Sequence, residues 1–190
     1  MKTRLVASSI TDARVSARQD DAEFVTLVNP RDCPIGSGGK LEVHRAGDLH
    51  RAFSILLVNP RCELLLQRRA RHKYHFAGRW SNACCGHPRP GEPKSAAARR
   101  RLYEELGIRV PLEKTTEFCY RATDPATGLT ENEYLHVYTG EFLGEPNPDP
   151  GEVGAWRWMS ESRLKRAIRR HPDSFTPWFH LLIGRLFPDQ

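Results

Sequence analysis

The sequence contains no long apolar run, and this absence narrows the kind of protein that it encodes. Charged residues make up 27% of its 190 positions and interrupt every apolar stretch before the roughly 18 residues that a membrane-spanning helix needs. The first 21 residues also lack the apolar segment of a secretory signal, and Asp12 argues against a transit peptide. We therefore predict no membrane insertion, a flexible N-terminal tail over residues 1–21 and a single domain over residues 22–190.

Cysteine and acidic residues are also scarce. Five cysteines are an odd number and suggest no disulfide framework, so we expect free thiols in a reducing cytoplasm. The 23 acidic residues are outnumbered by 29 lysines and arginines, which leaves a net charge of +6. That charge is compatible with a solvated surface, a polyanionic substrate or a nucleic acid, and composition alone selects none of them. The sequence does not indicate the oligomeric state.

Strand and helix patterns are mixed along the chain, which predicts an α+β domain. Apolar and β-branched runs predict strands over residues 23–29, 52–58, 63–69, 117–121, 131–139 and 155–159. The second and third of these strands are joined by a turn and are expected to form a hairpin, whereas the glycines between residues 36 and 39 predict a flexible link. Helices are expected between Pro93 and Gly107, from Ser160 through Arg170 and from Thr176 through Leu186.

Residues 82–108 hold the densest group of reactive side chains in the chain. The segment begins Asn-Ala-Cys-Cys-Gly-His, continues through a Pro/Gly-rich loop to Glu92, and then enters a helix that carries Arg101, Glu104 and Glu105. Arg101 and Glu105 are four residues apart, so a simple helical ion pair worth a few tenths of a kcal/mol is one explanation. Glu104 has no obvious partner in the sequence, which favours a functional role for this helix instead.

Two carboxylates of the strand at 131–139 share one face with apolar residues. Because side chains alternate along a strand, Glu131 and Glu133 point the same way as Leu135 and Val137. A carboxylate on a buried face requires a metal, a cation or a catalytic role. The alternative is that the strand begins in solvent, in which case both carboxylates are hydrated and have no special function.

Three histidines complete a candidate metal site. His44 and His50 are separated by Gly47, where we expect a bend, and considered alone they are most simply two surface histidines. Together with a third imidazole and the two strand carboxylates they offer three nitrogen and two oxygen donors, which suits an octahedral divalent cation. The candidate ligands are His44, His50, His87, Glu131 and Glu133. This donor set is compatible with Mg²⁺, Mn²⁺ or Zn²⁺.

The segment from Gly86 to Ile108 matches the Nudix box in length and pattern, with one departure. The matching positions are Gly86, Glu92, Arg100, Leu102, Glu104, Glu105, Gly107 and Ile108. Where the box has a glutamate directly after its arginine, this sequence has Arg101. That departure, together with the Asn-Ala-Cys-Cys-Gly-His motif and Glu131-Asn-Glu133, resembles the isopentenyl-diphosphate isomerases of the Nudix fold. The resemblance covers roughly residues 23–180.

The resemblance implies a Nudix fold, in which a mixed β-sheet is sandwiched between helices, here with an N-terminal extension. It also implies the interconversion of isopentenyl and dimethylallyl diphosphate through a tertiary carbocation, with one group protonating the alkene and another removing a proton. The substrate is then a small isoprenoid diphosphate, and the positive charge has a role that involves no nucleic acid. The alternative is a Nudix hydrolase of a nucleoside or other diphosphate, which Arg101 disfavours because a basic residue among metal-holding carboxylates should impair hydrolysis.

The resemblance also implies roles for individual residues. The catalytic positions correspond to Cys85, Glu133, Tyr120 and Trp178, whereas Cys84 corresponds to a variable neighbour. The first divalent metal, Mn²⁺, Mg²⁺ or Zn²⁺, corresponds to the His/Glu site described above. A diphosphate-bound Mg²⁺ corresponds to Glu105 and the backbone carbonyl of Cys85. The basic contacts to the diphosphate correspond to Lys40, Arg69, Lys73 and Arg101. Which of Cys85 and Glu133 acts as the acid in the forward direction stays open.

Overall fold

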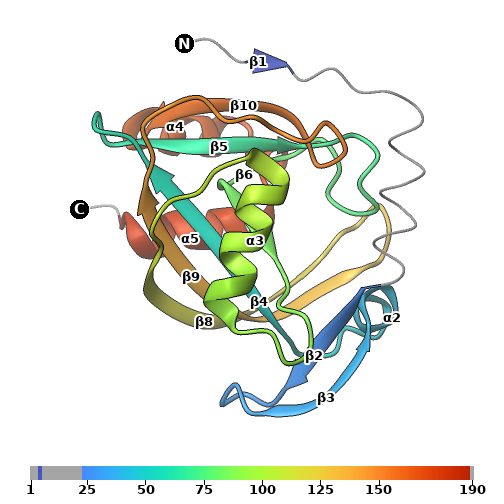
Figure 1. The fold of residues 1–190 in the computed structure, drawn as a ribbon. Coiled ribbons are helices and arrows are strands. Elements are labelled where there is room, and N and C mark those ends of the chain that lie inside the picture. The colour runs from blue at the N-terminus through green and yellow to red at the C-terminus, as the bar shows by residue number, and fades with distance from the viewer. Residues whose placement is uncertain (1–3, 6–22, 189–190) are drawn as a thin grey trace.

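The computed structural model describes residues 4–5 and 23–188 and contains one mixed β-sheet with helices on both faces (Figure 1). The strands are β1 (Arg4–Leu5), β2 (Phe24–Val28), β3 (Pro34–Gly39), β4 (His50–Val58), β5 (Glu63–Arg69), β6 (Trp80–Ser81), β7 (Cys84–Gly86), β8 (Glu113–Thr123), β9 (Thr130–Glu141) and β10 (Val153–Ser160). The helical segments are α2 (Lys40–Ala46), α3 (Lys94–Leu106), α4 (Glu161–Arg170), the 3₁₀ turn η1 (Pro172–Ser174) and α5 (Pro177–Leu186).

Strand β4 is the centre of the sheet. It runs parallel to β9 along its whole length, from the pair His50 and Glu133 onward, and antiparallel to β7, where Ser54 pairs with Cys85. Residues 53–55 pair with both neighbours, so β7 and β9 must lie on opposite edges of β4. This topology brings histidine, thiol and carboxylate side chains together from three separate parts of the chain.

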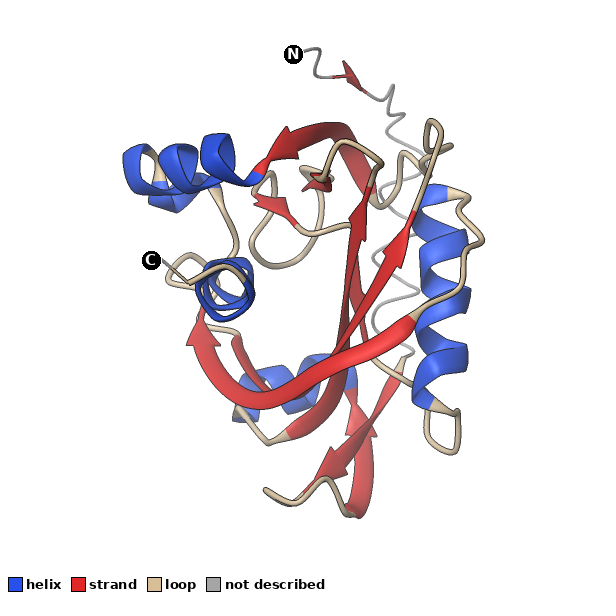
Figure 2. Ribbon diagram, turned by 90° about the vertical axis from the view of Figure 1, so that its left-hand side faces the viewer, coloured by secondary structure: helices blue, strands red, loops and turns tan. Residues whose placement is uncertain are grey.

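The alternation of side chains along β4 divides the core into two layers. Ala52 and Leu56 pack in the cluster that includes α5, while Phe53 and Ile55 pack in the cluster that includes α3. Figure 2 shows the corresponding layers, with α3 on one side of the sheet and α4 and α5 on the other. Each leucine-sized side chain buried in these layers contributes about 1.5–3 kcal/mol relative to exposure. The mixed sheet between helices agrees with the predicted fold class.

The predicted helix boundaries agree with the structure to within one residue. Helix α3 begins directly after Pro93, and it ends at Gly107, whose φ of 68° is left-handed. A Cβ atom at Gly107 would also lie 3.0 Å from the backbone oxygen of Asn147, so a glycine is favoured there on both counts. Ser160 precedes α4 as expected, but its side chain makes no capping hydrogen bond.

The glycine-rich segment is not the flexible link that the sequence predicted. Pro34 to Gly39 form the edge strand β3, which pairs antiparallel with β2, for example through Val25 and Gly38. Glycine has low strand propensity and no side-chain pattern to read, so only the backbone pairing with β2 reveals this strand. Gly38 is also tightly packed, because a Cβ atom there would lie 2.8 Å from the side chain of Val43.

Residues 4–5 are the only part of the predicted N-terminal tail that the structure describes. There β1 pairs antiparallel with β10, and the rest of the prediction for residues 1–21 lies outside the described residues. Over the described ranges, no helix combines the length and apolar character that crossing a membrane requires.

Candidate active site

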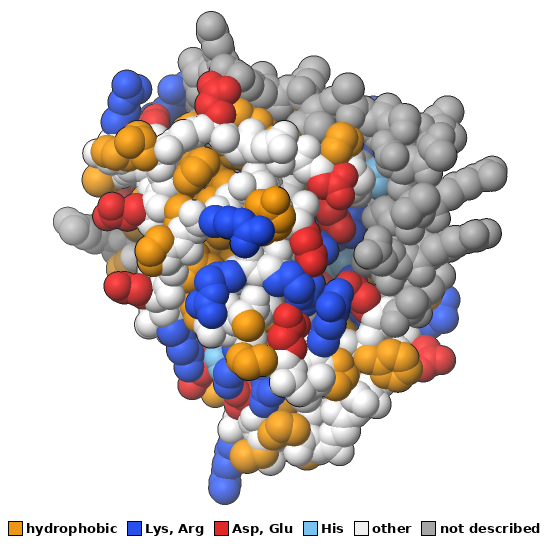
Figure 3. All heavy atoms as spheres, in the orientation of Figure 1, with side chains coloured by type: hydrophobic (Ala, Val, Ile, Leu, Met, Phe, Trp, Pro, Cys, Tyr) orange, Lys and Arg blue, Asp and Glu red, His pale blue; other side chains and the backbone are white. Residues whose placement is uncertain are grey.

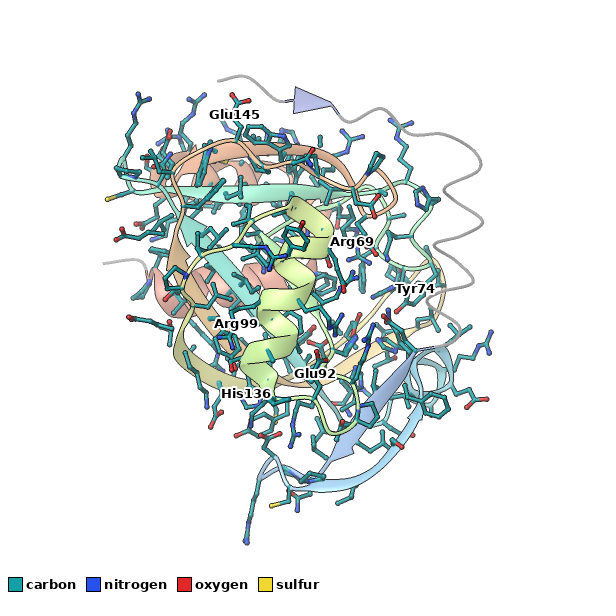
Figure 4. All side chains as sticks on the ribbon, viewed as in Figure 1. Arg69, Tyr74, Glu92, Arg99, His136 and Glu145 are labelled. Atoms are coloured by element: carbon teal, nitrogen blue, oxygen red, sulfur yellow. The ribbon has the colours of Figure 1, made fainter. Side chains whose placement is uncertain are left out.

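One pocket collects most of the candidate residues that the sequence indicated. Those that line it are Lys40, Arg69, Lys73, Cys85, His87, Arg101, Glu105, Tyr120, Glu131, Glu133 and Trp178. Figure 4 labels Arg69 at the end of β5 and Tyr74 in the following loop, both on the same side of α3. The side chains leave about 50 Å³ of free space in the pocket, which is room for one or two water molecules.

His44 and His50 lie beneath this pocket, so the explanation that they are surface histidines is wrong. Both side chains are fully buried. Helix α2 ends at Gly47, whose φ of 70° makes the expected bend. His44 Nδ1 lies 2.6 Å from the carbonyl oxygen of Lys40, and His50 Nδ1 lies 2.9 Å from that of Asp48. Because a carbonyl oxygen only accepts, both Nδ1 atoms carry a hydrogen. A neutral imidazole then presents a lone pair at Nε2, whereas a protonated one donates from Nε2.

The Nε2 atoms of His44, His50 and His87 converge on the carboxylates of β9. His44 Nε2 lies 3.0 Å from Glu131 Oε2, and His50 Nε2 lies 3.8 Å from the same oxygen. His87 Nε2 lies 3.1 Å from Glu133 Oε1, which in turn is 4.0 Å from His50 Nε2. Four of these donors, from His44, His50, His87 and Glu131, lie within 4.8 Å of one another.

This donor set fits a divalent metal. The Nε2 atom of His50 is buried and has no hydrogen-bond partner among the described residues, and a lone pair cannot bond to a carboxylate oxygen. A cation between them satisfies both. The hydrogen bonds that Nδ1 donates to backbone carbonyls orient the rings in the way that metal-ligating histidines require. Imidazole and carboxylate together do not select among Mg²⁺, Mn²⁺ and Zn²⁺.

Both carboxylates of β9 are buried, so the alternative that this strand begins in solvent is wrong. Glu131 is 3% exposed and Glu133 is 6% exposed. Burial and the neighbouring charge of Glu131 raise the pKa of Glu133 well above its usual range. Tyr120, its partner in the register between β8 and β9, is hydrogen-bonded to it. A carboxyl group with a raised pKa can both carry and accept a proton near neutral pH.

The two adjacent cysteines of β7 face opposite layers. Cys84 is completely buried in the α3 layer, whereas Cys85 borders the pocket. The Cys85 thiol donates to Asn82 Oδ1 at 3.1 Å and lies 3.3 Å from the Ser54 hydroxyl. Burial raises the pKa of Cys85 to about 12, so the sulfur is protonated at neutral pH. Cys85 is therefore the cysteine that can exchange a proton with a molecule in the pocket.

The other end of the pocket is a network of basic and acidic side chains. Glu152 accepts from Lys73 Nζ at 2.9 Å and from Arg101 NH2 at 3.0 Å. Arg101 also bonds to Glu105 at 2.8 Å, and Gln67 donates to the second oxygen of Glu105 at 2.9 Å. Burial raises the pKa of Glu105. Any anion that enters here has to compete with Glu152 for its two cations.

Glu104 does have partners, contrary to the inference from the sequence. It accepts from Arg100 at 3.1 Å and from Arg101 at 2.8 Å, while Arg100 also bonds to Glu92 at 2.8 Å. Figure 3 shows how acidic and basic side chains interleave over the face of α3. The Glu104 side chain is 39% exposed, so these pairs contribute at most about 1 kcal/mol. Glu104 therefore gives no independent support for a functional helix.

Comparison with known proteins identifies the family. The NUDIX domain model matches residues 48–179. The isopentenyl-diphosphate Delta-isomerase of Halorhodospira halophila (strain DSM 244 / SL1) is 48% identical over 163 residues, covering 85% of this chain and 93% of that protein. Isopentenyl-diphosphate Delta-isomerase 2 of Photorhabdus laumondii is 48% identical over 164 residues, covering 86% of this chain and 92% of that protein. The chain belongs to the isopentenyl-diphosphate Delta-isomerase family.

Solved structures share the fold of this isomerase-family chain. The crystal structure of DR0079 from Deinococcus radiodurans has a TM-score of 0.73 and 23% identity, covering 87% of this chain and 99% of that chain. The MutT protein from Methanosarcina mazei Go1 has a TM-score of 0.60 and 19% identity, covering 72% of this chain and 91% of that chain. At these identities the likeness concerns the fold alone. It confirms the predicted Nudix fold.

Sequence reasoning missed two residues that the isomerase-family fold brings into the site. His75 is buried and contacts the free oxygen of Glu131, and burial lowers its pKa to about 4. A histidine two positions after Lys73 is a ligand-type residue that could have been noticed. Glu152 had no such signal, because it lies in the turn before β10 and reaches the site only through the pairing of β10 with β5.

Proposed function

We propose that this chain interconverts isopentenyl diphosphate and dimethylallyl diphosphate by moving a double bond through a tertiary carbocation. The observation that carries the proposal is that Cys85 and Glu133 border one pocket from strands on opposite edges of β4. Basic side chains gather at the other end of the same pocket. The names of the relatives at 48% identity support the same reaction.

The proton chemistry requires one donor and one acceptor around a flat alkene. In this proposal one of Cys85 and Glu133 protonates the double bond, and the other removes a proton from the neighbouring carbon of the cation. The raised pKa of either group keeps its proton in place at neutral pH, which suits the donor, and whichever group is the acceptor has to enter the reaction deprotonated. Tyr120 supports Glu133 through their hydrogen bond. The reaction therefore consumes one proton and releases another, with no net change in the diphosphate.

The aromatic face of Trp178 is suited to stabilise the cation. Its Nε1 atom donates to Ser81 Oγ at 2.9 Å, which fixes the orientation of the ring. Trp178 is 3% exposed and lines the pocket, so the ring faces a space that excludes most water. A π-face attracts a positive charge most strongly when it is desolvated. Exclusion of water also prevents water from quenching the carbocation.

The diphosphate would be held by Lys40, Arg69, Lys73 and Arg101. The guanidinium forks of arginine match phosphate oxygens, and Lys73 and Arg101 become available when Glu152 releases them. Mg²⁺ would be held by Glu105 and the backbone carbonyl of Cys85, where it would neutralise phosphate charge. A second divalent metal, Mn²⁺, Mg²⁺ or Zn²⁺, would be held by His44, His50, His87 and Glu131 with Glu133 beside it.

A direct assay tests this function. The purified chain, supplied with Mg²⁺ and Mn²⁺, is incubated separately with isopentenyl diphosphate and with nucleoside diphosphates. We expect dimethylallyl diphosphate to accumulate and no phosphate to be released from the nucleotides. Release of phosphate from a nucleotide, with isopentenyl diphosphate left unchanged, would overturn the proposal in favour of a Nudix hydrolase.

A further inference from the structure

A second cavity lies between α4, β10 and the segment that leads from η1 into α5. It has a volume of about 530 Å³ and, within the described part of the chain, shares no lining residue with the catalytic pocket. Cavities of this size are typical of small-molecule sites. Its polar lining consists of Arg157, Arg163, Arg166, Arg170, His171 and Ser174. The proposed reaction gives these residues no role.

Among the residues that the structure describes, the lining of this cavity is basic and contains no carboxylate. Arg163, Arg166 and Arg170 follow a spacing of three and four residues, so they lie on one face of α4. Among the described residues, none of the three makes an ion pair or a hydrogen bond. Lys165, on another face of the same helix, is paired with Glu161 at 3.0 Å. The helix therefore presents three positive charges without an ion-pair partner to the cavity.

Arg157 adds a further positive charge to the lining of this cavity. Its guanidinium lies 3.9 Å from the centre of the Trp80 ring, which holds the group flat against one wall. Its Nε atom is buried without a hydrogen-bond partner in the described part of the chain. Burial and the neighbouring arginines, Arg163 and Arg68, lower its pKa. An anion in the cavity would supply the missing acceptor and relieve the repulsion.

We propose that this cavity is a second anion site, which binds the diphosphate group of a small molecule. Arginine forks match the paired oxygens of linked phosphates, and three arginines on α4 together with Arg157 provide more than one such fork. Inorganic diphosphate, a nucleoside diphosphate and a longer prenyl diphosphate all carry this group. The site does not depend on the proposed isomerase reaction, because no residue of the catalytic pocket contributes to it.

A matched pair of variants distinguishes a specific binding site from an open basic surface. Arg166 lines the cavity. Arg169 lies on the same helix and is also exposed to solvent, but it does not line the cavity. We expect isothermal titration of the full chain with inorganic diphosphate and Mg²⁺ to give two bound diphosphates per chain. Arg166→Ala should weaken one of these two sites by at least about tenfold, and Arg169→Ala should change it less than about twofold.

Several results would contradict the proposal. The first is a titration in which the wild-type chain binds a single diphosphate. In this case Arg69→Ala loses the binding and Arg166→Ala retains it. The second is equal weakening by Arg166→Ala and Arg169→Ala, which indicates only a solvated basic face. Saturable binding of a short RNA that depends equally on both arginines would place the surface in nucleic-acid recognition instead. Thermal unfolding of each variant identifies any that lose the fold.

The source of the diphosphate is found by changing the probe. Titrations with ADP and with a ten-carbon prenyl diphosphate are compared with inorganic diphosphate at the site that Arg166→Ala weakens. Equal affinity for all three identifies the diphosphate group as the whole ligand. Tighter binding of one organic probe identifies that class of molecule as the ligand of the site. Its organic part would then contact Trp80, Met159 or Phe175, which line the cavity. Either outcome supports the site, and failure of all three probes to bind there overturns it.

Discussion

Replacing Glu152 by glutamine is expected to weaken the fold and to strengthen diphosphate binding at the same time. The carboxylate accepts from Lys73 and Arg101, and although burial alone would raise its pKa, these two cations lower it from 4.5 to about 2. A pKa lowered this far corresponds to about 3 kcal/mol of preferential stabilisation of the charged form. Since the amide keeps one acceptor oxygen, we expect a loss of about 1–3 kcal/mol in the free energy of unfolding at pH 7.

The pH dependence of this loss has a defined direction. Because the folded pKa is lower than the unfolded one, Glu152 stabilises the protein above pH 4.5 and loses this contribution as the pH falls toward 2. Urea unfolding of the wild type and Glu152→Gln should therefore differ most near neutrality and converge in acid. Glu104→Gln is the matched control. It also removes a contact to Arg101, but its side chain is 39% exposed, so the expected loss is below about 1 kcal/mol.

Diphosphate affinity changes in the opposite direction. Without Glu152 as competitor, Lys73 and Arg101 each lose one carboxylate partner, which favours their contact with phosphate oxygens. We expect the inhibition constant of inorganic diphosphate against the isomerisation to fall about tenfold, which corresponds to about 1.4 kcal/mol. The contrary result is a Glu152→Gln variant that is as stable as the wild type at pH 7 and binds diphosphate more weakly. Glu152 would then be part of the binding site and not a competitor for it.

Three further predictions concern the proposed catalytic residues. Cys85→Ala should abolish turnover whereas Cys84→Ala, which changes only the α3 layer, should retain much of it; equal activity of the two variants would contradict the assignment of the thiol. Glu105→Gln should raise both KM and the Mg²⁺ concentration required for half-maximal rate, and unchanged values of both would exclude its role in holding Mg²⁺. His50→Ala should lower the divalent metal bound per chain after dialysis, measured by atomic emission, because it removes a buried lone pair from the donor set; undiminished metal content would show that the ion binds elsewhere.

The sequence predicted the structural features that depend only on neighbouring residues. The bend at Gly47 and the end of α3 at Gly107 follow from the left-handed conformation that glycine tolerates, and both were expected from the sequence. The shared face of Glu131 and Glu133 follows from strand alternation. Each of these features depends on a few consecutive residues, so the sequence contains all the information that is needed.

The features that the sequence did not predict depend on contacts between distant segments. Strand β3 exists because a glycine-rich segment pairs with β2, which no side-chain pattern indicates. Glu152 enters the site through the pairing of β10 with β5, 79 residues along the chain from its partner Lys73. The burial of His44 and His50 depends on β9 lying beside β4. The resemblance to the family grouped these histidines in one candidate site, which their spacing alone does not do.

In the proposed reaction this chain moves a proton onto and off an alkene whose diphosphate stays intact. The most direct measurement is the isomerisation of isopentenyl diphosphate in D₂O, followed by NMR and mass spectrometry. We expect that deuterium from the solvent enters the dimethylallyl product, that Cys85→Ala and Glu133→Gln eliminate this incorporation, and that no phosphate is released. Dimethylallyl diphosphate that forms without deuterium, or substrate that is hydrolysed without rearrangement, would contradict it.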